Sequence, residues 1–493
     1  MDIFRTKSVE QSIRDTEAPE HQLRKRLTAV DLTVFGIGVI IGTGIFVLTG
    51  EVAKEMAGPA VAVSFVVAGV VCALAALCYA EFASTIPVAG SAYTFSFATL
   101  GEFPAWIIGW DLLLELALAA AVVAVGWSGY FSALLRSIGV DLPASIAGED
   151  AVVDIPAVVI VLILTAILIA GIKLSSRVNL IIVIIKISVV LLVIVAGLFF
   201  INLANYSPFI PAPESTATVE GVQAPLIQVL FGITPVAFGV MGVFSAAAIV
   251  FFAFIGFDIV ATAAEETIEP QRALPRGILG SLAICTVLYV AVSLVVVGMQ
   301  RYSELSSEAP LADAFTAVGQ NWAAALISIG AIAGLTTVVM ILMLGQTRVL
   351  FAMCRDGLLP RPLAKVHPRT GTPALLTLIV GVVAAALAGF ISLSALAELV
   401  NIGTLFAFVV VSAGVIILRR TRPDLHRAFR APLVPVLPIL SVLACLYLML
   451  NLPVETWLRF LVWMVVGAVL YFTYGYRHSR MAREAGAPPR QPS

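Results

Sequence analysis

Long apolar stretches alternate with short polar segments along this 493-residue chain. Each stretch holds about 20 residues, the length of helix that crosses the hydrocarbon core of a bilayer. The pattern predicts twelve membrane-spanning helices and no separate soluble domain. The predicted spans are 32–52, 60–82, 103–127, 154–172, 178–201, 246–264, 277–299, 322–345, 374–391, 393–418, 432–450 and 455–476.

The segment 222–245 does not fit this pattern. Proline and glycine interrupt it at Pro225, Gly232, Pro235, Gly239 and Gly242. Because these residues break a long helix, we predict a surface or re-entrant piece before the sixth span.

Composition narrows the class of protein further. Hydrophobic residues make up 60% of the chain and charged residues only 12%, against about 25% charged in soluble domains. The net charge of −1 offers no basic face to nucleic acid. The four histidines fall in tails or loops, and the five cysteines are scattered, so we expect no metal and no cofactor. The spans also lack a buried nucleophile with its base, which argues against an enzyme.

The basic residues predict the orientation of the chain. If the N-terminus is cytoplasmic, 24 of the 29 lysines and arginines lie in cytoplasmic segments and four lie outside. The remaining one, Lys186, lies within a span. Cytoplasmic loops are enriched in basic residues, so we expect a plasma-membrane protein with both termini in the cytoplasm.

Two of the spans have a sequence that suits an interrupted helix. Span one contains GIGVIIGTGIF (Gly36–Phe46) and span six contains FFAFIGFD (Phe251–Asp258). Each glycine inside a helix costs about 1 kcal/mol, so the middle of span one unwinds easily. Paired broken helices in the two halves of a transporter mark its binding site.

The two halves also match in spacing. Thr43 and Ile255 are 212 residues apart, and Lys186 and Asn401 are 215 apart, which predicts a five-plus-five inverted repeat. The predicted divisions are an N-terminal tail (1–30), a first repeat (31–201), a connecting segment (202–245), a second repeat (246–418), spans eleven and twelve (419–476) and a C-terminal tail (477–493).

An unwound break leaves backbone groups without partners, and a zwitterion can satisfy them. The N–H groups of the first break, which suit a carboxylate, are those around Gly42, Thr43 and Gly44. The carbonyls of the second break, which suit an ammonium, are those of Phe252, Ala253 and Ile255. The alternative is that the glycines only permit close helix packing.

Several motifs carry a family resemblance. They are GIGVIIGTGIFVLTG, CYAEFASTIPVAGSAY, FFAFIGFD followed by TAAEET, GQTRVLFAMCRDGLLP and ELVNIGTLFAF. Together they resemble amino acid permeases of the amino acid–polyamine–organocation superfamily, nearest to bacterial relatives of the cationic amino acid transporters. The resemblance implies an all-α fold of the leucine-transporter type and alternating access around a site at the membrane midplane.

The resemblance also implies roles for individual residues. Ile40, Thr43 and Gly44 match the positions that bind the substrate carboxylate, and Phe252 matches the aromatic residue that closes over the substrate. The chain differs from the animal cationic transporters in two ways. It carries extra residues between about 210 and 245, and it has twelve spans rather than fourteen.

Lys186 lies in the middle of span five, where an ammonium is costly unless a partner or the loss of a proton relieves it. The resemblance places this lysine where sodium-coupled relatives bind a cation, against the backbone of span one. We therefore predict that Lys186 couples transport to protons. The alternative is a lysine that snorkels to the membrane surface.

Other charged residues are candidates for specificity and gating. Asp111 and Glu115 stand four apart on one face of span three, and Glu115 is deep enough to reach a central cavity. Asp258 is expected to cap the second half of span six. An inner gate is predicted between the carboxylates of Glu265 and Glu266 and the guanidinium of Arg348, and solvated helix ends are the alternative.

The substrate follows from the residues around the site. The stretch from Thr336 to Leu342 in span eight offers no carboxylate for a cationic side chain, so we expect a neutral L-amino acid such as alanine, with Leu342 in contact. The sequence thus predicts a monomeric, proton-coupled permease. Cationic amino acid uptake, which rests on Glu115, and amino acid exchange are the alternatives. A channel or a nutrient sensor are alternatives of another class.

Overall fold

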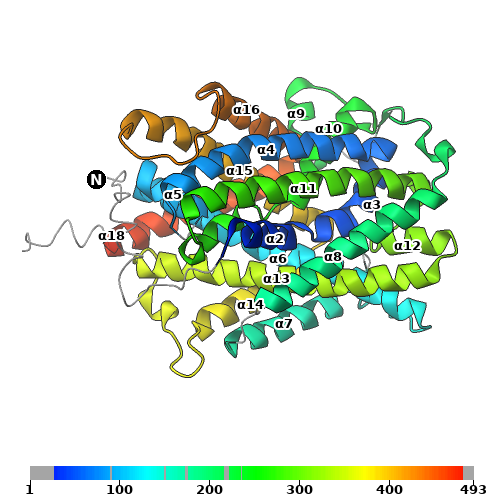
Figure 1. The fold of residues 1–493 in the computed structure, drawn as a ribbon, viewed down its shortest axis with the longest axis horizontal. Helices are drawn as coiled ribbons and strands as arrows, with labels where there is room; N and C mark the ends of the chain where they lie inside the picture. Colours follow the sequence, from blue (N-terminus) through cyan, green and yellow to red (C-terminus); the bar gives the residue numbers. More distant parts are fainter. Residues whose placement is uncertain are drawn as a thin grey trace, which may run out of the picture.

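The computed structural model describes residues 27–88, 91–148, 151–171, 176–215, 221–234 and 236–480. This part of the chain is mostly helical, and its long helices run side by side (Figure 1). The described chain starts and finishes at the same end of the bundle, on the left in Figure 1. We call this the termini end, and the other the opposite end.

The helices follow one another along the chain with short connections. The first are α2 (Ala29–Ile40), α3 (Thr49–Val52), α4 (Val61–Thr85), α5 (Ser91–Thr99), α6 (Glu102–Ser137), α7 (Ile155–Ile169) and α8 (Ser176–Gly197). Then come α9 (Leu226–Phe231), α10 (Gly239–Val250), α11 (Pro270–Met299), α12 (Pro310–Ala317), α13 (Asn321–Arg355), α14 (Ala374–Phe390) and α15 (Leu393–Thr421). The last are α16 (Val436–Leu450), α17 (Val454–Leu470) and α18 (Tyr476–His478).

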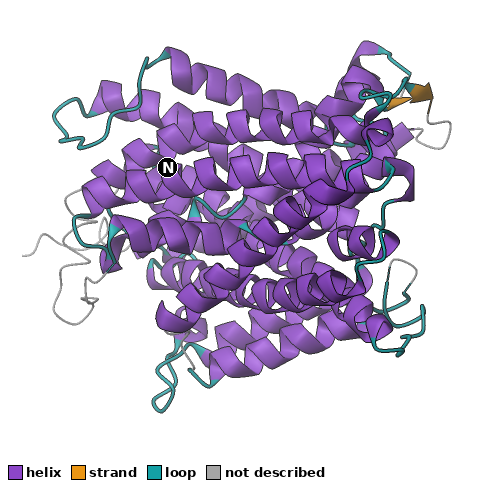
Figure 2. Ribbon diagram, turned by 45° about the vertical axis from the view of Figure 1, so that its right-hand side comes forward, coloured by secondary structure: helices purple, strands orange, loops and turns teal. Residues whose placement is uncertain are grey.

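Shorter elements complete the described chain. The π-helical segments are η1 (Gly44–Leu48), η2 (Ala53–Ala57) and η11 (Tyr471–Gly475). The 3₁₀ segments are η3 (Gly58–Ala60), η4 (Leu198–Phe200), η5 (Leu203–Tyr206), η6 (Gly221–Gln223), η7 (Phe251–Phe254), η8 (Ile259–Glu266), η9 (Tyr302–Glu304) and η10 (Arg361–Ala364). The strands β1 (Glu214–Ser215) and β2 (Val236–Ala237) form an antiparallel pair at the opposite end (Figure 2).

Local signals explain where helices begin and end. Thr28 and Asp31 form a capping box at the start of α2, since the backbone N–H of each donates to the side chain of the other. Asp154 caps α7, and its Oδ1 accepts from Ala157 N at 3.0 Å. Gly58, with φ +59°, and Pro59 separate span one from α4.

Every predicted span coincides with an apolar helical segment. Among the described residues, eight helical stretches are long and apolar enough to cross a membrane, and four more apolar helices are shorter. Several boundaries differ from the prediction. The helices of spans three and eight run on to Ser137 and Arg355, and that of span seven starts at Pro270. The helix of span six starts at Gly239 rather than at residue 246. Gly242 lies against the carbonyl of Met56, so glycine here allows close packing and does not end the helix.

The segment predicted as a surface or re-entrant piece covers the opposite end of the bundle. Its β2 strand pairs with β1, and Phe238 N donates to Met56 O at 2.9 Å. Leu226 N donates to Leu452 O at 3.0 Å. The segment is therefore hydrogen-bonded both to the end of span one and to the loop between α16 and α17.

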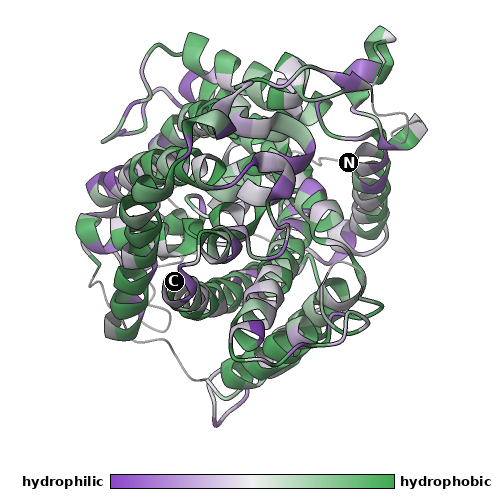
Figure 3. Cartoon of the chain, turned by 90° about the vertical axis from the view of Figure 1, so that its right-hand side faces the viewer, coloured by the Kyte–Doolittle hydropathy of each residue, from purple (hydrophilic) through white to green (hydrophobic). Residues whose placement is uncertain are grey.

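Burial separates the centre of the bundle from its rim. The most apolar window of α6 is 89% buried, whereas that of α8 is 33% buried. Large apolar side chains such as Val159 on α7, Ile181 on α8 and Val465 on α17 are exposed. The end-on view has apolar residues on the outer helices (Figure 3). Because such a surface is stable only against lipid, the chain is a multi-pass membrane protein.

Candidate functional site

The first span is interrupted at its middle. Helix α2 ends at Ile40, Ile41 is extended with ψ 94°, and η1 begins at Gly44. Helical hydrogen bonding resumes where Ile45 N and Phe46 N both donate to Gly42 O at 3.3 Å. The N–H groups at the start of the second half of this span point toward the break, which is the arrangement that attracts an anion.

The sixth span is interrupted at the same level. Helix α10 ends at Val250 and continues as one 3₁₀ turn, η7, after which Ile255 is extended with ψ 136°. Gly256 has φ +120°, a conformation that side chains with a Cβ rarely adopt. The backbone carbonyls of η7 and Ile255 therefore end the first half of span six.

The two breaks lie against each other. A methyl group on Gly44 would collide with the backbone of Ala253 and lie 2.9 Å from its nitrogen. Only glycine lets the start of η1 approach η7 this closely. The proposed carboxylate end and the proposed amine end of the site therefore share one small space.

A cavity of about 20 Å³ lies between the breaks. It is lined by Val39, Ile40, Gly42, Thr43, Gly44, Ala119, Val123, Phe252, Ile255, Val338 and Leu342. This volume admits about one water molecule, so a substrate must push these residues apart. Every lining side chain except that of Thr43 is apolar, which favours an aliphatic group.

Seven of the predicted substrate-binding residues line this cavity, and two do not. Ala253 packs against Gly44 beside it, and Glu115 lies one turn along α6 from Ala119. The sequence prediction did not name Val39, Ala119 and Val123, whereas Val338 lies within the predicted stretch from Thr336 to Leu342. Small apolar residues are common in every span, so their identity gave no signal.

Two tyrosines hold the interrupted first span in place. Tyr289 Oη on α11 donates to Ile40 O at 2.6 Å, and Tyr130 Oη on α6 donates to Phe46 O at 2.6 Å. Both tyrosines are fully buried. The hydroxyl of a buried tyrosine usually makes a hydrogen bond. A tyrosine within an apolar span therefore indicates such a contact, and the sequence prediction did not use this signal.

Lys186 is fully buried on α8, which excludes the snorkelling alternative. Its Nζ donates to Gly38 O at 2.5 Å, in the last turn of α2. The aliphatic part of its side chain packs against Gly334 of α13. The single ammonium thus connects α8 to the half of span one that precedes the break.

Asp111 and Glu115 both face α15, as their spacing on one helix face predicts. Asp111 packs against Gly403, and Glu115 interacts with the hydroxyl of Thr404. Both carboxyls are buried, and neither oxygen of Asp111 has a hydrogen-bond partner among the described residues.

Asp258 does not cap the second half of span six, so that prediction is wrong. Its carboxylate turns back and accepts from Gly256 N at 3.3 Å, and it makes no side-chain cap bond to η8. The reason is the sharp turn at Gly256, which brings that N–H within reach. Asp258 thereby stabilises the break itself.

The predicted inner gate lies at the termini end. Arg348 Nη2 is 3.9 Å from Glu266 Oε1, and both side chains are about half exposed, at 54% and 41%. The side chain of Glu265 lies outside the described part of the structure. Leu27 N also donates to Glu266 O at 3.0 Å, so the start of the chain joins this contact.

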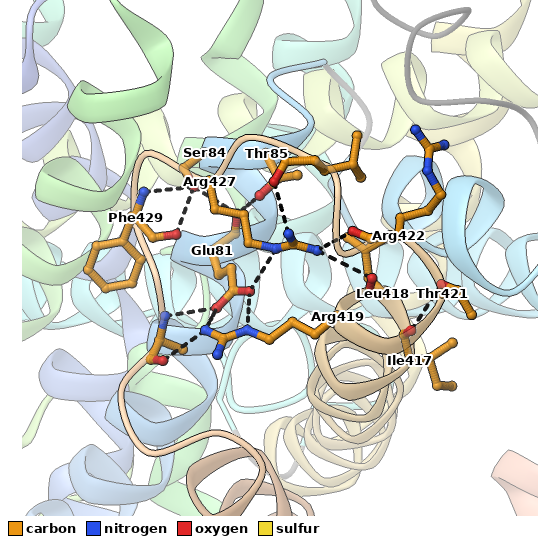
Figure 4. Close-up of polar contacts among 12 residues, drawn as sticks. Glu81, Ser84, Thr85, Ile417, Leu418, Arg419, Thr421, Arg422, Arg427 and Phe429 are labelled. Atoms are coloured by element: carbon orange, nitrogen blue, oxygen red, sulfur yellow. Dashed lines mark hydrogen bonds and ion pairs between the residues drawn. The ribbon is translucent and has the colours of Figure 1, made fainter.

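A stronger ionic cluster at the same end was missed by the sequence prediction (Figure 4). Glu81 on α4 accepts from Arg419 Nε at 2.8 Å and from Arg419 Nη2 at 2.6 Å. Arg427 Nε lies 3.4 Å from Glu81 Oε1, and Ala431 N donates to Oε2 at 2.8 Å. Glu81 thus fixes the end of α15 and the loop after it to α4. The sequence signal for this cluster was a single glutamate in the otherwise apolar span two.

A second cavity, of about 460 Å³, lies at the opposite end. Its lining includes Val47 and Gly126, and Gly126 contacts Thr43 of the small cavity. Glu51, Asp154 and Glu308 also line it. The large cavity therefore leads toward the breaks and is separated from them by the contact between Thr43 and Gly126.

A membrane-embedded bundle with a cavity between two broken helices is typical of transporters. The sequence profile of the amino acid permease family matches residues 27–471. The chain belongs to this family, within the amino acid–polyamine–organocation superfamily, and is an amino acid transporter rather than an enzyme.

Individual relatives differ in what they carry. The chain is 49% identical to a branched-chain amino acid permease of Bacillus subtilis (strain 168), over 97% of this chain and 99% of that protein. It is 47% identical to a methylthioribose transporter of the same organism, over 97% and 98%. It is 40% identical to the vacuolar cationic amino acid transporter 4 of Arabidopsis thaliana, over 82% of this chain and 65% of that protein.

Proposed function

We propose that this protein imports neutral L-amino acids, from alanine to branched-chain size, across the plasma membrane by proton-coupled symport. The proposed architecture is twelve spans in a five-plus-five inverted repeat followed by two more. The termini end faces the cytoplasm, and the protein acts as a monomer. The large cavity then opens to the outside, and the Glu266–Arg348 pair forms the gate on the cytoplasmic side.

One observation carries the choice of substrate. The cavity between the breaks is lined by aliphatic side chains and holds no carboxylate among its lining residues. A guanidinium or ε-ammonium placed there would lose its hydration without gaining a partner, which is unfavourable by several kcal/mol. An aliphatic side chain would instead gain about 25 cal/mol for each Å² of apolar surface buried.

The position of Lys186 supports coupling to protons. Its ammonium donates to Gly38 O inside the membrane, and the contact depends on the donor. Loss of the proton weakens this tie and frees the first half of span one to move. Protonation and deprotonation of Lys186 would thus alternately fix and release the first half of span one.

The relatives carry substrates with different side chains, so the preference of the side-chain pocket must be tested. The branched-chain amino acid permease supports an aliphatic substrate for this protein. The substrate of the methylthioribose transporter also bears an apolar group. The cationic alternative rests on Glu115, which lies beyond the lining of the cavity. We therefore rank aliphatic amino acids first.

The substrate class is tested by competition in proteoliposomes of the purified protein. Uptake of labelled L-leucine is measured with excess L-alanine, L-isoleucine, L-arginine or methylthioribose, and empty liposomes serve as the control. We expect alanine and isoleucine to compete and arginine to have no effect. Competition by arginine alone would contradict the proposal and assign specificity to Glu115. Competition by methylthioribose alone would replace the amino acid with a thio-sugar.

A further inference from the structure

Asn401 lies in the first third of α15 and contacts the first half of span six. It is fully buried, and its Nδ2 donates to Ala248 O and to Ile249 O, each at 2.9 Å. These carbonyls belong to the last turn of α10, directly before the chain changes to the 3₁₀ turn η7. Carbonyls at the end of a helix are the ones that need partners from outside it.

The chemistry of this contact is specific. An uncharged amide nitrogen can donate two hydrogen bonds, and both groups that face it are acceptors. The Oδ1 atom has no hydrogen-bond partner among the described residues. A buried amide oxygen without a partner destabilises a protein, so leucine would suit a purely apolar contact better. The two N–H donors of the amide are therefore what makes asparagine suitable at this position.

The first break has a contact of the same kind. Lys186, on the fifth predicted span of the first half, donates to Gly38 O in the last turn of α2. Asn401, on the fifth predicted span of the second half, donates to the last turn of α10. Each half of the chain thus ties the helix before its break to its own fifth span. Only the first of these two donors can lose a proton at accessible pH.

We propose that Asn401 is a positioning residue for the amine end of the substrate site. It acts through α10, because holding Ala248 and Ile249 fixes where the backbone turns. That turn decides where the carbonyls of Phe252, Ala253 and Ile255 point. The inference rests on the proposed function, which assigns the substrate ammonium to these carbonyls.

Binding competition on the full-length protein tests this role. The probes are L-leucine and L-leucinol, which keeps the amine and lacks the carboxylate. We expect Asn401→Leu to weaken both by about tenfold, the loss typical of one or two hydrogen bonds. Asn401→Gln keeps the amide and should recover most of the affinity for leucinol. Thr43→Val, at the carboxylate end, should weaken leucine and leave leucinol unchanged.

The matched control is Asn451→Leu. Asn451 is also buried, and its Nδ2 donates to Tyr447 O at 2.8 Å, far along the chain from both breaks. This variant should bind both probes as the wild type does. If Asn401→Leu does not fold, Asn401→Asp keeps the shape and leaves at most one donor for the two carbonyls, so it should also weaken both probes.

Two results would overturn the inference in different ways. If the wild type binds leucine and Asn401→Leu leaves leucinol affinity unchanged, Asn401 does not position the amine end, and the proposed function stands. If the wild type binds neither leucine nor alanine, the proposed function fails and the inference fails with it. A loss for leucine without any loss for leucinol would also contradict the role.

Discussion

At the scale of single residues, the site depends on a few buried polar groups in apolar surroundings. Lys186, Tyr289 and Asn401 each donate to a backbone carbonyl beside a break. The membrane interior offers no water to replace these bonds, so each donor has a larger effect than it would on a surface. The proposed specificity, in contrast, rests on apolar side chains whose volumes set the size of the cavity.

Lys186→Ala removes the ammonium that contacts the span before the first break. We expect substrate binding to remain and accumulation driven by a proton gradient to be lost, because no group is left there to exchange a proton. Uptake of labelled L-leucine in proteoliposomes measures this, with the exposed Lys365→Ala as a control. Full accumulation by Lys186→Ala would rule out its role in coupling.

Ala119→Val reduces the space at the wall of the cavity. The two added methyl groups should raise the KM for leucine about tenfold and change that for alanine less, since each methylene in a tight pocket matters strongly. Ala166→Val on the exposed face of α7 is the matched control. An equal effect on both substrates would show that Ala119 does not contact the side chain.

At the scale of elements, the two breaks pack directly against each other. The ends of two helices at the termini end are joined by ion pairs. Gly44 allows η1 to meet η7. At the termini end, Glu81 joins α4, α15 and the following loop through two arginines.

Gly44→Ala should separate the two breaks. The added methyl group meets the backbone of Ala253, which has no flexible side chain to yield. We expect transport to fall at least about tenfold, as for small displacements in other preorganised sites. Gly345→Ala is the control, because its nearest neighbour is a Leu116 methyl 4.0 Å away. Unchanged uptake by Gly44→Ala would mean that the breaks need not touch.

Glu81→Gln leaves Arg419 and Arg427 without their carboxylate. We expect a loss of about 2 kcal/mol in stability, below the full cost of breaking a buried pair because Arg419 is partly exposed. Thermal unfolding of the detergent-solubilised protein measures this. The exposed Glu304→Gln should leave the unfolding temperature unchanged. An unaltered Glu81→Gln protein would show that the cluster adds nothing to stability.

At the scale of the whole molecule, the sequence predicted the helices better than their contacts. Each predicted span overlaps an apolar helix, because a membrane requires about 20 apolar residues wherever a helix crosses it, and eight of these helical stretches are long enough to cross. The glycines of span one and Gly256 located the breaks. The start of span six at Gly239 was missed, since its glycines favour close packing with Met56 and resemble a loop in sequence.

The residues missed at the site share a physical cause. Ala119 and Val123 are ordinary in composition and matter only because spans one, three, six and eight converge on one cavity. The roles of Tyr130 and Tyr289 likewise depend on which carbonyl lies opposite each hydroxyl. Such contacts between distant parts of the chain have no local pattern, whereas a buried charge such as Lys186 stands out within its own span.

The most direct test of the whole account is accumulation of labelled L-alanine, L-leucine and, separately, L-arginine in proteoliposomes without internal amino acid. An inward proton gradient is imposed and then collapsed with a protonophore. The account predicts that alanine and leucine rise above equilibrium and fall back when the gradient is removed, while arginine is not accumulated. Uptake that requires preloaded amino acid and ignores the gradient would identify an exchanger and contradict proton-coupled symport.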